Sequence, residues 1–204
     1  MKEKIRKIIE READAVMNIP LSDDFAEAIQ LIHHQVHVLN GKLIVSGMGK
    51  VGQIAENIAT TFSSTGTPAI FLHPSEAQHG DLGILQGNDI LLVISNSGRT
   101  REIIELIGLA KALFSDIPVI AITGNDSPSF RDELDCLIFT GNPKEVCPLD
   151  LTPTTSTTVM TVIGDILVVL MMEKIGFTAG DYAKRHHSGY LGAKSREAGK
   201  KTQI

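Results

Sequence analysis

The stretch that decides the fold is KLIVSGMG, residues 42–49. Its short apolar run ends in a turn with two glycines, as a buried strand entering a tight turn would. The same alternation recurs along the chain. Further strands are predicted at 68–72, 89–94, 117–122 and 136–140, with helices at 50–65, near 100–114 and near 128–134. We therefore predict an α/β fold with a doubly wound, five-stranded parallel sheet that is flanked by helices on both faces.

Helices are also predicted before and after this core. Apolar residues recur at spacings of three and four over 2–17 and over 22–39, where an Asn-Gly pair ends the second helix. A last long helix should run from about 154 to 174, and the tail after it has no clear periodicity. We interpret residues 1–40 as N-terminal helices that pack on a domain formed by residues 41–204, as one structural unit overall.

Composition excludes several classes of protein. Of the 204 residues, 43% are apolar and 21% charged, which excludes global disorder. The net charge of −5 gives no field that would draw the protein to nucleic acid or anionic lipid. The most apolar stretch, 159–172, is interrupted by Gly164 and Asp165 and predicts a buried helix rather than a membrane span. Residues 1–7 do not resemble a signal peptide, and two cysteines without a CxxC motif favour the cytoplasm.

Three predicted strands end in residues that can bind a ligand. They are followed by SGMGK at 46–50, SNSGRT at 95–100 and TGN at 123–125. In an open parallel sheet, ligands bind beyond the carboxyl ends of the strands. Residues 95–100, called here the serine turn, bring three hydroxyls and a glycine to a helix start, where they can converge on one phosphate. The alternative is a helix cap with incidental serines. GMGKVG at 47–52 places its third glycine too early for a dinucleotide-binding turn.

Six motifs along the chain form a set. They are GMGK at 47–50, TGTP at 65–68, HGDLG at 79–83, SNSG at 95–98, KE at 144–145 with CPL at 147–149, and PTTSTT at 153–158. Together they resemble the sugar isomerase (SIS) domain of bacterial D-arabinose-5-phosphate isomerases, over about residues 40–195. The serine turn is shared by all SIS domains, whereas the HGDLG and KExCPL segments are more particular to this isomerase.

The resemblance implies a flavodoxin-like fold and an activity. Enzymes of this family interconvert D-ribulose 5-phosphate and D-arabinose 5-phosphate, which supplies the acidic eight-carbon sugar of lipopolysaccharide or capsule. The resemblance also implies a homotetramer with active sites shared between subunits, and neither a cofactor nor a metal ion. Carried over by position, the catalytic residues are Lys50, Glu102, Glu145 and His186, and the substrate or phosphate contacts are Gly49, Ser95, Asn96, Ser97, Thr100 and His79.

Each proposed catalytic residue has a chemical reason. Moving a carbonyl between two carbons needs a base, a donor to stabilise the enediolate and an acid. Glu145, in an irregular stretch between prolines, is the first choice for the base, while Glu102 equally suits a helix dipole. Lys50 can neutralise the oxyanion or simply face water. His186 can transfer a proton, open the sugar ring or face water, and its tail is expected to complete a neighbouring subunit's site.

Other features have plainer interpretations. His33, His34 and His37 are spaced for a metal ion, but no carboxylate or cysteine completes the set, which favours a solvated or oligomer-facing surface. Cys147 is interpreted as packing. The hydroxyls of 152–158 can cap the last helix or add a second ligand edge.

The sequence departs from the family pattern in two respects, and it leaves two alternative functions open. Members usually continue into a pair of CBS domains, which this sequence lacks, so we expect a natural single-domain isomerase or a shortened form. Arg99 stands where the serine turn often has an acidic residue, which suggests an extra phosphate or subunit contact. The alternatives are a non-catalytic phosphosugar sensor and an isomerase of a six- or seven-carbon phosphate.

Overall fold

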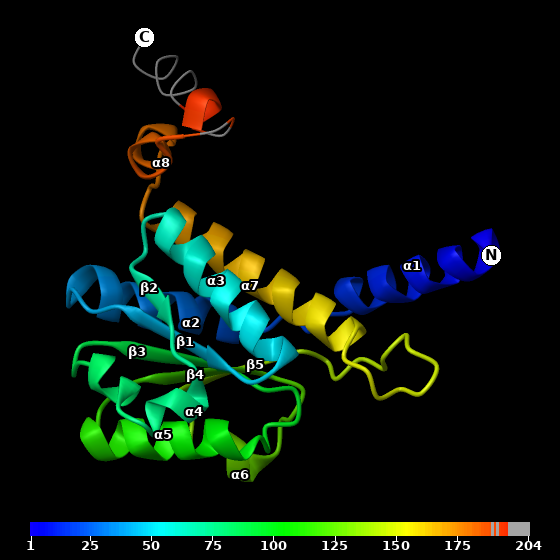
Figure 1. Ribbon diagram of the computed structural model, residues 1–204, viewed down its shortest axis with the longest axis horizontal. Coiled ribbons are helices and arrows are strands. Elements are labelled where there is room, and N and C mark those ends of the chain that lie inside the picture. Colours follow the sequence, from blue (N-terminus) through cyan, green and yellow to red (C-terminus); the bar gives the residue numbers. More distant parts are fainter. Residues whose placement is uncertain (189, 191, 196–204) are drawn as a thin grey trace.

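The computed structural model describes residues 1–188, 190 and 192–195 (Figure 1). Its centre is a five-stranded parallel sheet with the strand order β2-β1-β3-β4-β5. The strands are β1 (Leu43–Gly47), β2 (Ala69–Phe71), β3 (Ile90–Ile94), β4 (Val119–Thr123) and β5 (Cys136–Phe139). This is the flavodoxin-like order of doubly wound sheets, so the predicted fold class is confirmed.

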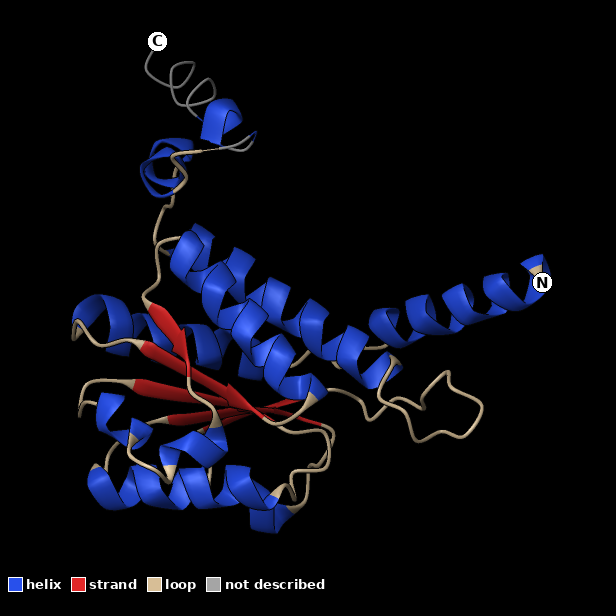
Figure 2. Ribbon diagram, in the orientation of Figure 1, coloured by secondary structure: helices blue, strands red, loops and turns tan. Residues whose placement is uncertain are grey.

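Helices cover both faces of the sheet (Figures 1 and 2). One layer holds α2 (Asp24–Ile32), α3 (Lys50–Ser64) and α7 (Thr155–Lys174), and the other holds α4 (Pro74–Ala77), α5 (Arg101–Leu113) and α6 (Pro128–Arg131). Along β1, Leu43 and Val45 pack with the first layer while Ile44 packs with the second. The central strands are apolar at nearly every position because both of their faces are buried.

The N-terminal helices differ in how they meet this core. α1 (Lys2–Met17) buries no residue fully and extends away from the body beside the start of α7 (Figure 1). α2 packs on β5 and α7 and continues into a π-helical turn over His33–Val38. The helix predicted over 22–39 is therefore an α-helix followed by a wider turn, in which Leu39 N–H donates to the carbonyl of His34.

α7 is a long helix that is rich in apolar residues. By length and composition this helix could cross a membrane, but half of the apolar 18-residue stretch that meets this criterion is buried inside the protein. Its partners are α1, α2 and α3. Its burial against these helices agrees with the predicted core helix.

Some helical turns were not predicted. The tail after residue 176 was expected to lack periodicity, yet it forms α8 (Ala179–Arg185). A capping box begins this helix, because the Thr178 hydroxyl accepts from Asp181 N–H and the Asp181 carboxylate accepts from Thr178 N–H. The connection after β2 holds α4 and a 3-10 turn at Asp81–Ile84. These elements are short and depend on local caps, which periodicity does not detect.

Candidate functional site

The strand order places the switch point of the sheet between β1 and β3. The register pairs Gly47 at the end of β1 with Ile94 at the end of β3. The turn that leads to α3 and the serine turn that leads to α5 therefore start side by side, where doubly wound sheets bind ligands. Gly47 must be glycine here, since a Cβ would lie 2.8 Å from the Val51 carbonyl oxygen. Gly49 (φ +65°) then starts α3 at Lys50.

The serine turn keeps hydroxyls and amides together at the start of α5. Ser95 is buried, and its Oγ lies 3.0 Å from Thr100 Oγ1. Ser97 is exposed, and its Oγ accepts from Arg99 N–H at 3.1 Å. Gly98 (φ +59°) reverses the chain. Within the described residues no side chain caps α5, so its N-terminus remains open to an external anion.

Asn96 joins the serine turn to the next strand. Gly124 N–H donates to the Asn96 carbonyl at 3.0 Å, and a Cβ on Gly124 would lie 2.7 Å from Asn96 Oδ1. This Oδ1 is buried, and among the described residues it has no hydrogen-bond partner. Asn142 Oδ1 approaches the same point. Asn142 was not predicted as a site residue; it lies three residues beyond β5 with a left-handed backbone, and its place after a strand end is the signal that could have indicated it.

Glu145 occupies the N-terminus of α7. Its Oε2 accepts from the backbone N–H groups of Thr154 and Thr155, both at 2.7 Å, and from Thr154 Oγ1 at 2.9 Å. Ser156 donates its N–H to Oε2 at 3.3 Å and its hydroxyl to Oε1. We call this arrangement the α7 cap. The carboxylate of Glu145, which is 9% exposed, therefore serves as the anion that this helix start binds.

The α7 cap also sets the charge of Glu145. Burial would by itself raise the pKa of this carboxyl group, but the hydrogen bonds from Ser156 and Thr154 outweigh burial and hold the pKa below its usual value. Glu145 is therefore anionic at neutral pH. The hydroxyls of Thr154 and Ser156, predicted as either a cap or a ligand edge, donate to the Glu145 carboxylate, and the Thr154 side chain does not itself cap the helix.

Lys50 faces the same end of the molecule from α3. It is exposed and lines a groove of about 500 Å³ between α3 and α7. The groove is also lined by Gln53, Ile54, Asn57, Pro153, Thr157, Thr158 and Thr161. The start of α3 and the capped start of α7 thus border one opening, with a cation on one side.

The positions of Glu102 and His79 do not by themselves indicate a role in the site. Glu102 is half-buried in the first turn of α5, and in the described part of the chain it has no hydrogen bond or ion pair. In the first turns of this helix, the glutamate that forms an ion pair is Glu105, which binds Arg101 at 2.6 Å and Gln78 at 2.8 Å. His79 is exposed in the turn between α4 and Asp81–Ile84.

His186 does not join the other proposed residues within one chain. It follows α8, where its ring stacks on Tyr182 with centroids 3.7 Å apart. α7 has 20 residues and is thus about 30 Å long. Glu145 caps one end of α7, and α8 lies beyond the other end (Figure 1).

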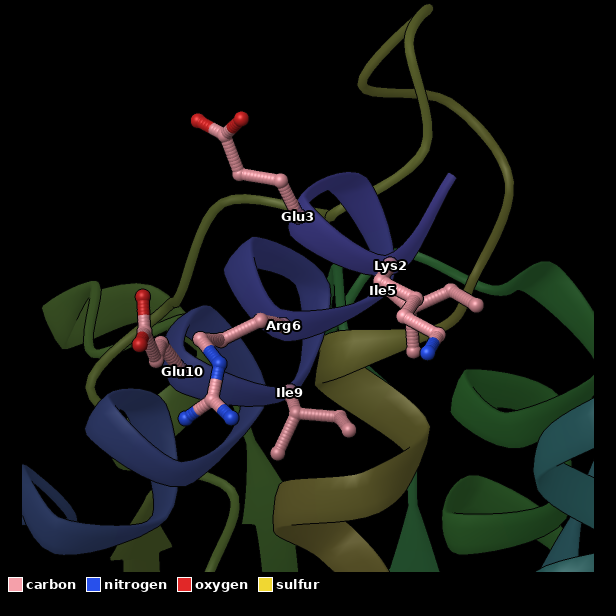
Figure 3. A pocket seen from close by; sticks show the side chains of 6 residues that line it. All are labelled: Lys2, Glu3, Ile5, Arg6, Ile9 and Glu10. Carbon is pink, nitrogen blue, oxygen red and sulfur yellow. The ribbon is translucent and has the colours of Figure 1, made fainter.

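Other clusters lie away from the sheet edge. A groove of about 520 Å³ runs along α1 and is lined by Lys2, Glu3, Ile5, Arg6, Ile9 and Glu10, whose side chains are drawn in Figure 3. The His33 and His37 rings stack at 5.6 Å, and His37 Nε2 lies 3.1 Å from Thr67 Oγ1. Burial and the neighbouring His33 lower the pKa of His37. Among the described residues, the group spaced to hold a metal ion is Asp24, Glu27 and Cys136.

Comparison with known proteins gives a consistent set of relatives. The family model described as SIS domain matches residues 38–170. The Yersinia pestis protein named arabinose 5-phosphate isomerase KdsD is 44% identical over 186 residues, which are 91% of this chain and 55% of the relative. The Pseudomonas aeruginosa protein of that name is 41% identical over 184 residues, 90% of this chain and 55% of the relative. The chain thus spans about half the length of these curated relatives.

Two solved structures are similar over nearly their whole length. One is a Bacteroides fragilis protein provisionally named a phosphosugar isomerase involved in capsule formation. It is 61% identical with a TM-score of 0.91, over 93% of this chain and 99% of that one. The other is an Escherichia coli protein in complex with arabinose 5-phosphate, 34% identical with a TM-score of 0.81, over 89% of this chain and 95% of that one.

Proposed function

The chain belongs to the SIS domain family, and from this premise we propose that it is an aldose–ketose isomerase that interconverts D-ribulose 5-phosphate and D-arabinose 5-phosphate. The observation that supports this proposal most is that an open anion site and a bound carboxylate lie at the same end of the sheet. The serine turn leaves the start of α5 open, while Glu145 fills the start of α7. A sugar phosphate needs the first for its phosphate and the second for proton transfer. The KdsD relatives and the structure with bound arabinose 5-phosphate support this substrate class.

The phosphate would bind at the serine turn. The hydroxyls of Ser95, Ser97 and Thr100 surround the uncapped start of α5, where backbone N–H groups and the helix dipole favour a dianion. Asn96 and Gly49, at the two adjoining turns, are proposed to contact the sugar. His79 remains a proposed contact to sugar hydroxyls.

Proton transfer would proceed through an enediol. Glu145 removes the proton from the carbon beside the carbonyl, and Lys50 stabilises the negative charge that then develops on oxygen. The proton then returns to the former carbonyl carbon, and the hydroxyl proton of the neighbouring carbon moves to the former carbonyl oxygen, which completes the isomerisation. Four of the five donors meet Glu145 Oε2, and among the described residues only Ser156 Oγ donates to Oε1, so Oε1 is the oxygen proposed to take the proton. Glu102 is the second carboxylate proposed near the reacting carbons.

His186 is proposed to act in the site of a neighbouring subunit. The helix that separates it from Glu145 supports this arrangement, because one chain does not bring the two together. Exposed apolar side chains at Ile5, Ile9 and Val169 are available to form contacts between subunits. We propose a homotetramer with active sites shared between subunits.

The proposed place in metabolism follows from the relatives. The reaction would supply the precursor of 3-deoxy-D-manno-octulosonate for lipopolysaccharide or capsule in the cytoplasm. The relative named for capsule formation supports the second of these destinations.

A second candidate function is a non-catalytic phosphosugar sensor. It is favoured by the full engagement of Glu145, whose carboxylate accepts five hydrogen bonds from α7 and whose pKa is low. A carboxylate held in this way caps a helix without any need for catalysis. Under this alternative the serine turn binds the phosphate and no proton moves.

One assay separates the two candidates. The purified protein is incubated with D-arabinose 5-phosphate and a metal chelator, and formation of D-ribulose 5-phosphate is measured. Turnover that survives chelation supports the metal-free isomerase. Binding without turnover supports the sensor, and turnover with six- or seven-carbon phosphates alone would move the proposal to another isomerase.

A further inference from the structure

The last turns of α1 contact the segment that carries Glu145. Arg11 Nη2 donates to the Glu145 carbonyl oxygen at 2.8 Å, and Thr155 Oγ1 donates to Glu12 Oε1 at 2.9 Å. α1 lies beside the start of α7 in Figure 1. These contacts come from outside residues 38–170, the part of the chain that the family model matches.

Hydrogen bonds of Thr155 link Glu12 to the α7 cap. Thr155 is 1% exposed, so its single hydroxyl proton needs a partner inside the protein. Because that proton goes to Glu12, the oxygen is free to accept from Val146 N–H at 3.0 Å. Thr155 N–H in turn donates to Glu145 Oε2 at 2.7 Å. Glu12 therefore orients a hydroxyl that holds the residue next to Glu145.

Packing of α1 against α7 does not require a carboxylate at position 12. Its Oε2 is buried and, within the described residues, has no hydrogen-bond partner. A buried carboxylate oxygen without a partner lowers stability. An alanine at this position of α1 would avoid that loss, so the carboxylate is better explained by what it does to Thr155.

We propose that Glu12 is a positioning residue for the reaction, which sets the Thr155 hydroxyl and through it the place of Glu145. Arg11 assists by holding the Glu145 backbone. The inference rests on the proposed function, since it gives Glu145 a role in proton transfer. α1 is therefore part of the site architecture, although it contributes no group to the substrate.

The first test measures amide hydrogen exchange and does not depend on activity. In Glu12→Ala we expect the Val146 and Thr155 amides to exchange at least about tenfold faster than in the wild type. Glu12→Gln, which keeps an acceptor oxygen, should stay near the wild type. Glu10→Ala is the matched control, because Glu10 is an exposed glutamate two positions earlier on the same helix. Unchanged exchange in Glu12→Ala would overturn the proposal.

The second test is kinetic and uses D-arabinose 5-phosphate. Glu12→Ala should lower kcat about tenfold with KM within about twofold, because a displaced base slows chemistry more than binding. Glu12→Gln should restore most of kcat. Since Glu12 acts through Thr155, Glu12→Ala combined with Thr155→Val should be no slower than Thr155→Val alone. Fully additive losses, or an equal loss in Glu10→Ala, would contradict the role.

These tests keep the two proposals apart. A wild-type protein that binds the sugar without turnover would refute the isomerase, and the exchange data would still decide whether Glu12 positions the α7 cap. Should Glu12→Ala not fold, Glu12→Asp withdraws the acceptor by one methylene and replaces it in both tests.

Discussion

The N-termini of α5 and α7 are built from similar residues, but only the N-terminus of α7 binds a carboxylate of the chain itself. SNSGRT precedes α5 and TPTTST spans the start of α7, so both helices begin among hydroxyls. At α7 the donors converge on the carboxylate of Glu145. At α5 no side chain of the described residues caps the helix. Two similar anion sites therefore differ in whether the chain fills them itself, which leaves α5 for an external phosphate.

The difference arises in the segments that precede the two helices. The serine turn is short and passes directly from β3 to α5. The segment between β5 and α7 is longer, and left-handed residues at Asn142 and Asp150 fold it back. Asp150 Oδ1 also accepts from Glu145 N–H at 2.7 Å. The long connection thus returns a carboxylate to its own helix start, whereas the serine turn contains no acidic residue that could do so.

The largest expected effect tests whether the filled site is catalytic. Glu145→Gln removes the proton acceptor, and we expect kcat to fall roughly a thousandfold, while binding of the sugar phosphate is spared. Steady-state kinetics and calorimetric binding measure the two quantities. Near-wild-type turnover would show that Glu145 is a helix cap and not the base.

The second effect concerns stability and its dependence on pH. Glu145 has a folded pKa below its unfolded value of about 4.3, so its contribution is present above that pH and is lost as pH falls through the folded pKa. At pH 7 we expect Glu145→Gln to lower the free energy of unfolding by about 2 kcal/mol. Urea unfolding of both proteins between pH 7 and pH 3 should show this gap narrowing with acid. A gap that is constant or widens would contradict the low pKa.

The third effect tests whether the open site binds phosphate. Ser95→Ala and Ser97→Ala should each weaken substrate binding about tenfold, since each removes a hydrogen bond to a charged group. kcat should change little because these hydroxyls are proposed to bind the phosphate and not the reacting carbons. Ser22→Ala is the control, as its hydroxyl bonds Asp24 near the start of α2. Equal KM values in all three variants would argue against a phosphate at α5.

The smallest expected effect concerns Cys147, which lies in the segment between Glu145 and the N-terminus of α7. N–H groups of Thr152 and Leu151 lower the pKa of the Cys147 thiol, whereas burial and then Glu27 raise the pKa of Cys136 to about 12. Cys147 should therefore react first with iodoacetamide at pH 8, because the thiolate is the nucleophile. Peptide mass spectrometry would report the order, and equal labelling of both cysteines would contradict the structure around Cys147.

Much of the fold follows from local patterns. The five strands were predicted within about two residues of their ends, because apolar runs bounded by turn residues depend on near neighbours alone. α8 was missed because its signal is a single capping box, and the helix over 22–39 was expected to be uniform but widens at His33–Val38. The apolar spacing over 22–39 does not distinguish a uniform α-helix from an α-helix that ends in a π-helical turn.

The candidate site was predicted in part. The turns after β1 and β3 were expected at one edge, and the register of Gly47 with Ile94 brings them together. The α7 cap was not foreseen as the place of Glu145, and neither Asn142 nor Glu12 was predicted to belong to the site. These residues act through contacts that cross the molecule, and their sequence neighbours carry no sign of them.

By itself, the sequence determined the alternation of strands and helices and the hydroxyl-rich turns at their ends, since both depend on residues a few positions apart. The tertiary structure alone decided which helix start is filled. Arg11 meets Glu145 across 134 positions and Glu12 meets Thr155 across 143. Such contacts form only when helices pack on the sheet and bring their ends together, because a polar group that is buried there loses its hydrogen bonds to water and gains from a partner in the protein.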